Sequence, residues 1–195
     1  RYGFMATGFG PVENYGLVGP DQFQHYWHHP PGIHLLVGMS FKIFGIGEWQ
    51  ARLVPLLISL MNLVVFYRLI QRDMGVVGRV AAMVFFISTP MMAYYGPFVN
   101  QEALTLLVCM GSLLLYRRWR DDPHSSLKGA AVLAVIAAWT DWPWLVFAFL
   151  IASVEMVRQA RRYRKGEQIQ WRWLVVFSCG VMIGCIAMTL HLMAM

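Results

Sequence analysis

Long apolar runs alternate with short polar segments along the whole chain. The runs Leu53 to Tyr67 and Trp173 to Met195 contain no Asp, Glu, Lys or Arg, and they approach the roughly 20 residues that a helix needs to cross a bilayer. Each apolar run is therefore predicted to be a helix. The pattern predicts helices at about 31–45, 49–70, 76–95, 101–120, 127–140, 143–160 and 172–195.

Two of these regions need a more detailed interpretation. Residues 31–45 are too short to span and are interrupted by Lys42, which favours an interfacial or re-entrant helix. Residues 127–157 could form one helix, but Pro143 and the polar pair Thr140 and Asp141 favour a hairpin with two short arms of about 14 to 18 residues each. Its turn would then lie in a cavity that opens outward, because non-helical backbone is tolerated at that depth only beside protein or water.

The composition agrees with a bilayer environment. Hydrophobic residues make up 58% of the chain and charged residues 13%, against about 25% charged residues in soluble domains, and the mean hydropathy is +0.51. The sequence therefore predicts an all-α integral membrane protein, a polytopic helical bundle, rather than a water-soluble domain. The cysteines, Cys109, Cys179 and Cys185, lie in apolar runs as small hydrophobes, so redox chemistry is not expected.

Three basic clusters give the orientation of the helices. They hold 13 of the 16 Lys and Arg residues, and such residues collect in cytoplasmic loops. If all three are cytoplasmic, residues 1–50, 95–102 and 140–144 lie on the outer side. The net charge of +6 is then explained by basic clusters that face lipid headgroups, and no nucleic-acid partner is expected. The clusters are Arg68, Arg72 and Arg79; Arg117, Arg118, Arg120 and Lys128; and Arg158, Arg161, Arg162, Arg164, Lys165 and Arg172.

The first polar segment of the outer side contains three histidines, His25, His28 and His29, just before Pro30 and Pro31. One interpretation is a rigid interfacial loop whose aromatic side chains lie at headgroup level. The alternatives are a contact to substrate or phosphate and the ligation of a divalent metal. The residue before a proline is pushed out of helical geometry, so His29 cannot continue a helical face begun by His25 and His28.

Two further outer segments each carry an acid. Asn100 is a suitable N-cap and Glu102 lies in the first helical turn, where the helix dipole favours a carboxylate. Alternatively, Glu102 faces the cavity as a base, a metal ligand or an acceptor contact. Asp141 can cap the helix that Pro143 helps to start, or it can contact substrate beside the indole of Trp142.

The domain organisation follows from these segments. Residues 1–48 are predicted to form an outer loop with a His-Pro-Pro turn and an interfacial helix, and residues 49–195 about six membrane helices of one partial transmembrane domain. Both ends look truncated, because the chain starts at Arg1 rather than at Met and stops at Met195 inside an apolar run.

Several motifs follow one another along the chain. They are RYGF near the start, then HHPPGIHLLVGMSFKIFGIGEWQARLVPLL, RLIQRDMGVVGRVAAMVFFISTPMMAYYG, FVNQEALTL and AAWTDWPW. This order of a His-Pro-Pro turn, a short helix, a Tyr-Tyr turn leading to an acid and an acid-bearing hairpin resembles the superfamily of dolichyl-phosphate-mannose-protein mannosyltransferases and aminoarabinose transferases. These are GT-C glycosyltransferases of family 39 type, and the resemblance covers most of residues 1–160.

The resemblance implies a GT-C fold and a transfer of sugar from a polyprenyl phosphate to a protein, lipid or glycan on the outer side of the membrane. Glu102 matches the acid after the Tyr-Tyr turn. The family's catalytic acid pair lies upstream of the RYGF segment, so the principal acid is expected before Arg1. Asp141 stands where many relatives carry Lys, so the donor phosphate would be bound by Arg52, by His29 or by the missing half.

We therefore expect a multi-pass glycosyltransferase of the cell inner membrane that moves a hexosyl or pentosyl group on the outer face. Its partners would be the polyprenyl-phosphate sugar donor, membrane lipids and other membrane subunits; the sequence identifies no cofactor and leaves a divalent metal open. The alternative is a non-catalytic scaffold subunit of a larger complex that retains the GT-C fold. The expected site residues are Glu102 as the catalytic residue and His28, His29, Asn100, Arg52, Asp141 and Trp142 as substrate-binding residues.

Overall fold

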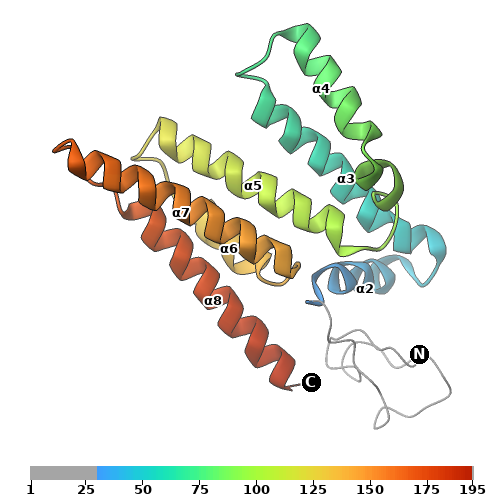
Figure 1. Cartoon of the computed structure of the whole chain (residues 1–195). Coiled ribbons are helices and arrows are strands. Elements are labelled where there is room, and N and C mark those ends of the chain that lie inside the picture. Colours follow the sequence, from blue (N-terminus) through green and yellow to red (C-terminus); the bar gives the residue numbers. More distant parts are fainter. Residues whose placement is uncertain (1–29, 195) are drawn as a thin grey trace.

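The computed structural model describes residues 30–194, and this part of the chain consists of helices and turns without a strand. The all-α prediction is thereby confirmed. His28 and His29 lie outside the described residues. In chain order the elements are α2 (Gly32–Phe44), α3 (Glu48–Ile70), α4 (Val76–Ser88), the π-helix η2 (Met91–Tyr95), α5 (Gln101–Asp121), α6 (Lys128–Ala137), α7 (Trp142–Arg164) and α8 (Arg172–Ala194) (Figure 1).

Three described helices are long and apolar enough to cross a bilayer, namely Glu48–Ile70, Trp142–Arg164 and Arg172–Met193. Their outward faces carry large apolar side chains such as Val64, Phe149 and Ile183, all of them exposed. Such faces are covered by lipid in a membrane protein. The expected total of about six membrane helices stays a prediction, because α4 and α6 have only 13 and 10 residues.

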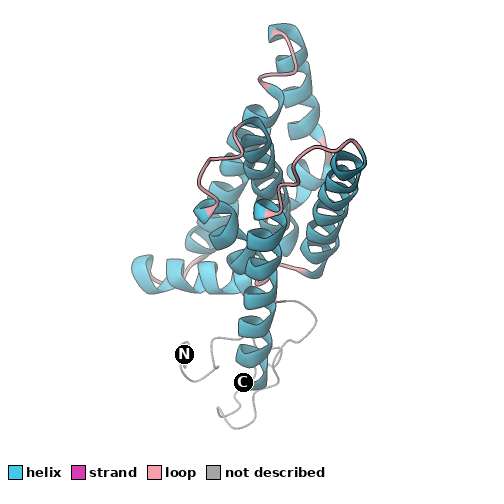
Figure 2. Cartoon of the chain, turned by 90° about the vertical axis from the view of Figure 1, so that its left-hand side faces the viewer, coloured by secondary structure: helices cyan, strands magenta, loops and turns pink. Residues whose placement is uncertain are grey.

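The short helix α2 lies across one end of the bundle, whereas α3, α5 and α7 run along it (Figures 1 and 2). Its 13 residues reach only about 20 Å at 1.5 Å per residue. It packs on α3 through Ser40, whose Oγ donates to Gln50 O at 2.8 Å. This arrangement suits the predicted interfacial or re-entrant helix.

The prediction of one continuous helix at 76–95 was wrong after Ser88. α4 ends at Ser88, Thr89 has an extended backbone with φ −62° and ψ 141°, and the π-helix η2 follows Pro90. The cause is Pro90, which disfavours helical geometry in the residue before it. The chain therefore changes its path just ahead of α5.

The hairpin predicted between 127 and 157 is confirmed, but its two short arms are not. α6 has 10 residues, whereas α7 has 23 and is long enough to span. α7 continues to Arg164 because the basic residues after Val157 end the apolar stretch without ending the helix. The turn between the arms contains Thr140 and Asp141.

Small residues set the close packing of α6 on α8. A Cβ at Gly184 would lie 2.6 Å from Val135 O, and a Cβ at Gly180 would lie 2.9 Å from Ala134 Cβ. Such close approach is typical of helix pairs in membranes. A buried apolar cluster formed by Ile33, Ile58, Ala103 and Leu104 joins α2, α3 and α5.

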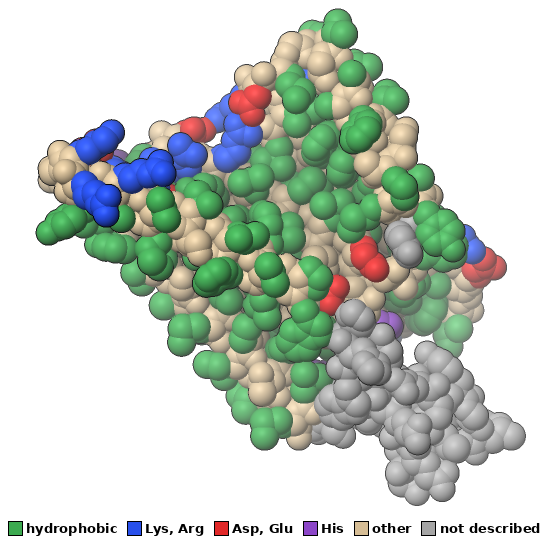
Figure 3. Space-filling model, viewed as in Figure 1, with side chains coloured by type: hydrophobic (Ala, Val, Ile, Leu, Met, Phe, Trp, Pro, Cys, Tyr) green, Lys and Arg blue, Asp and Glu red, His purple; other side chains and the backbone are tan. Residues whose placement is uncertain are grey.

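The arginine-bearing turns all lie at one end of the molecule, where basic side chains gather in Figure 3. Arg117 Nη2 pairs with Asp73 Oδ2 at 2.7 Å, and Arg72 pairs with Asp121, so both pairs join the α3–α4 turn to the end of α5. Arg172 Nη1 donates to Pro123 O at 3.4 Å, which joins α8 to the α5–α6 turn. We call this the basic end. The acidic end is opposite and comprises α2, residues 91–102 and residues 138–142.

Candidate active site

The acidic end brings the start of α2 onto the α6–α7 turn. Gly32 N donates to Trp139 O at 2.9 Å, and a Cβ at Gly32 would clash with the same carbonyl oxygen. Pro30 and Pro31 are fully buried. The prolines of the His-Pro-Pro turn are therefore held next to the segment that carries Asp141.

Glu102 lies in the first turn of α5 at this end. Asn100 is the N-cap of the helix, and its Oδ1 accepts from Gln101 N at 2.8 Å, as the capping interpretation predicts. Glu102 Oε2 is shielded from solvent and has no hydrogen-bond partner among residues 30–194. The cap of α5 is thus provided by Asn100, and one carboxyl oxygen of Glu102 is left without a structural role in the described fold.

Two polar residues of α3 hold the chain on both sides of Glu102. Asn62 is fully buried, and its Nδ2 donates to Ala103 O at 2.8 Å. Ser59 Oγ donates to Gly96 O at 2.9 Å. The sequence interpretation missed both residues. Their signal is polar side chains three positions apart in an otherwise apolar run, which lie on one face of a helix.

Asp141 lies in the α6–α7 turn and is only 6% exposed. Its Oδ1 accepts from Trp142 N at 2.8 Å, so it caps α7, and Pro143 follows in the first turn. Trp142 is exposed, whereas Trp144 is fully buried in the core. The capping role of Asp141 is therefore confirmed, and Trp142 presents an indole at the surface of the acidic end.

Arg52 lies in the first turns of α3. Its Nη2 pairs with Glu48 Oε1 at 2.7 Å, and its guanidinium lies 5.7 Å from the ring centre of Phe98. The contact to Phe98 joins Arg52 to the segment that leads into α5. About half of the Arg52 side chain is exposed, so it remains accessible to an anionic group at this end.

A sequence profile of a known family covers most of the chain. The profile described as dolichyl-phosphate-mannose-protein mannosyltransferase matches residues 28–183 of the 195. The chain belongs to this family. Comparison with curated proteins and with solved structures gave no match.

Membership in this mannosyltransferase family makes the chain a GT-C-type member of the membrane glycosyltransferases, as the ordered motifs indicate. The matched range includes α2, the Tyr-Tyr turn, Glu102 and the acidic hairpin. Within residues 30–194, no group of three His, Cys, Asp or Glu side chains is arranged to hold a metal ion. The described residues of this end offer a shielded carboxyl oxygen on Glu102, an exposed indole on Trp142 and a half-exposed guanidinium on Arg52.

Proposed function

We propose that this protein transfers a sugar from a polyprenyl-phosphate donor to an acceptor at the acidic end of the bundle. The observation that carries the proposal is the shielded Glu102 Oε2, which no residue in the range 30–194 satisfies. A buried polar atom without a partner costs stability, and a ligand or a reaction that uses the atom is one reason to retain it. Membership in a glycosyltransferase family supports sugar transfer as that reaction.

The outer face of the inner membrane is the proposed location of the chemistry. Basic residues collect on the cytoplasmic side of membrane proteins, and the three arginine-bearing turns share the basic end. The acidic end would then face outward. A lipid-linked donor reaches it from the bilayer, because its polyprenyl chain stays among the exposed apolar side chains while its phosphate extends to the membrane surface.

In the proposed reaction, the acceptor hydroxyl oxygen forms a bond to C1 of the sugar as the bond from C1 to the phosphate oxygen breaks. The phosphate leaves with the electron pair, and the hydroxyl proton passes to a carboxylate. Glu102 is the residue of this chain that we propose to supply this carboxylate. Arg52, His28 and His29 are proposed to bind the donor phosphate, and Asn100, Asp141 and Trp142 to line the sugar and acceptor site.

The test is the substitution Glu102→Gln in the full protein, assayed in proteoliposomes that contain a polyprenyl-phosphate sugar. Loss of a positioned carboxylate is expected to lower the transfer rate by about 100-fold or more, with normal insertion and assembly. The matched control is Glu167→Gln, at an exposed glutamate near the basic end, which should leave the rate unchanged. Full activity of Glu102→Gln would remove Glu102 from the site, whereas a non-catalytic scaffold predicts no transfer by the wild type either.

A further inference from the structure

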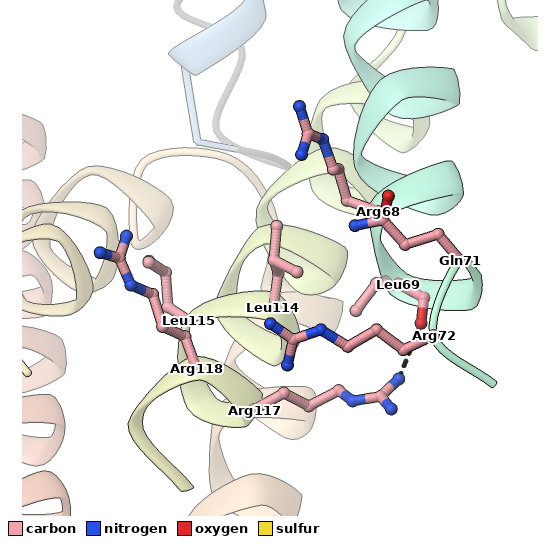
Figure 4. Close-up of a pocket in the computed structure, with 8 residues that line it drawn as sticks. All are labelled: Arg68, Leu69, Gln71, Arg72, Leu114, Leu115, Arg117 and Arg118. Atoms are coloured by element: carbon pink, nitrogen blue, oxygen red, sulfur yellow. Dashed lines mark hydrogen bonds between the residues drawn. The ribbon is translucent and has the colours of Figure 1, made fainter. Parts of the chain in front are cut away.

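A cavity of about 360 Å³ lies at the basic end between α3 and α5. Four arginines line it, Arg68 and Arg72 from α3 and its turn, and Arg117 and Arg118 from α5. Leu114 and Leu115 lie between them (Figure 4). The cavity is on the opposite side of the molecule from the candidate active site, and the proposed sugar transfer does not use it.

Only two of the four arginines are neutralised. Arg72 pairs with Asp121, and Arg117 pairs with Asp73 at 2.7 Å while its Nη1 donates to Leu69 O at 2.8 Å. The guanidinium groups of Arg68 and Arg118 have neither an ion pair nor a hydrogen bond with any residue of the described range, 30–194. Four guanidiniums and two carboxylates leave a net charge of +2 in and around the cavity, so it attracts an anion.

The positions of the two unpaired arginines suit one ligand. Figure 4 shows Arg68 and Arg118 on opposite sides of Leu114, one on each helix. An anion in the cavity is attracted by both unpaired guanidinium groups, one from each helix. Phosphate is favoured among anions because the planar fork of arginine matches its oxygens.

The apolar surroundings favour a phosphate that belongs to a lipid. Leu60, Val64 and Arg68 are spaced four apart, so they form one stripe along α3, and Leu60 and Val64 are both exposed. An acyl chain can follow this stripe while the headgroup remains at Arg68. Leu114 and Leu115 extend the apolar surface into the cavity itself. A free inorganic phosphate would gain nothing from these contacts.

We propose that this cavity, defined by Arg68, Arg72, Arg117 and Arg118 with Leu114 and Leu115, binds the headgroup of an anionic phospholipid. Basic pockets between membrane helices commonly bind such headgroups. The bound lipid bridges α3 and α5 at the basic end. These are also the helices that position Glu102 through Asn62, so the lipid stabilises the same pair of helices from the other end.

The test measures lipid binding to the full protein in detergent micelles by native mass spectrometry, with phosphatidylglycerol compared against phosphatidylcholine. The wild type is expected to retain phosphatidylglycerol in preference to phosphatidylcholine. The double substitution Arg68→Gln and Arg118→Gln is expected to weaken phosphatidylglycerol binding about tenfold or more. Each single variant is measured as well, so that a folding failure of the pair does not remove the test.

The matched control is Arg161→Gln with Arg164→Gln, which removes two exposed arginines from the basic end outside the cavity. It should change lipid binding less than about twofold, because general attraction to an anionic surface falls only slightly. Equal losses in both double variants would overturn the proposal in favour of diffuse attraction. Glycerol phosphate that binds as tightly as the lipid would overturn the assignment of a lipid.

Discussion

Glu155 and Glu102 each have a carboxyl oxygen that is shielded from solvent, yet these oxygens have opposite surroundings. Glu155 on α7 is fully buried, and Tyr116 Oη donates to its Oε2 at 2.5 Å. Arg158 Nη1 lies 3.3 Å from the same oxygen, and Gln159 donates to the other one. Glu102 Oε2 is also shielded, but no residue of the described range donates to it.

The difference separates a structural glutamate from the one that we propose as catalytic. A buried carboxyl group whose oxygens are all satisfied rigidifies the elements that it joins, and the network of Glu155 extends to the segment before α8, because Gln170 N donates to Gln159 Oε1 at 2.9 Å. An unsatisfied group contributes no such link and costs free energy. We therefore expect substitutions of Glu155 to affect folding and substitutions of Glu102 to affect chemistry.

The largest expected effect on stability belongs to Glu155→Ala. The substitution leaves the hydroxyl of Tyr116 and the amide of Gln159 buried without their acceptor, so the free energy of unfolding should fall by about 3 kcal/mol or more. Equilibrium unfolding in mixed micelles measures it. Glu155→Gln keeps an acceptor oxygen for Tyr116 and should lose less, about 1 kcal/mol. Equal stability of Glu155→Ala and the wild type would show that the network does not stabilise the fold.

The second expected effect is at Asn62, where one substitution should lower both the stability and the transfer rate. Asn62→Leu removes the hydrogen bond to Ala103 O and should lower the free energy of unfolding by about 1 kcal/mol. Because Ala103 directly follows Glu102, the transfer rate of the folded protein should fall as well. The control is Ser112→Ala, at a buried α5 hydroxyl without a partner in residues 30–194, which should lower neither the free energy of unfolding nor the transfer rate. A normal transfer rate in Asn62→Leu would show that Asn62 does not position Glu102.

Much of the fold could be predicted from the sequence because its signals are local. Pro143 with Thr140 and Asp141 predicts the hairpin, and long uncharged runs predict α3 and α8. The errors come from effects that an apolar run does not reveal. Pro90 stops α4 although the apolar pattern continues, and α7 extends beyond its apolar stretch because Arg161 and Arg162 are good helix formers in water.

The site could be predicted only in part. Glu102 and Asp141 stand out because acids are rare near membrane helices, and Asn100 has the position of an N-cap. The contact between Asn62 and Ala103 joins residues 41 positions apart, so no local pattern contains it. The same holds for Gly32, whose need for a small side chain arises from the distant carbonyl of Trp139.

A smaller effect on stability is expected for Glu102→Gln, the substitution that tests the proposed chemistry. Since no hydrogen bond to Oε2 from residues 30–194 is lost, the free energy of unfolding should change by less than about 1 kcal/mol, and a gain in stability is consistent with removal of an unsatisfied group. The same unfolding measurement, run beside Glu155→Gln, compares one chemical change at two positions. A loss at Glu102 that exceeds the loss at Glu155 would reverse the assignment of the two roles.

The smallest effect on stability is expected at Glu167. This residue tests whether the effect of a glutamate depends on its burial or on its position near the arginines. Glu167 lies at the basic end like Glu155, and its Oε2 pairs with Arg162 Nε at 3.2 Å, but about half of its side chain is exposed. Exposed ion pairs contribute little, so Glu167→Gln should change the free energy of unfolding by less than about 0.5 kcal/mol, and less still at high salt. Unfolding at low and high ionic strength measures both values. If Glu167→Gln were as destabilising as Glu155→Ala, the stabilising effect of both glutamates would come from their proximity to the arginine-rich turns. Burial with hydrogen-bonded carboxyl oxygens would then not be the cause.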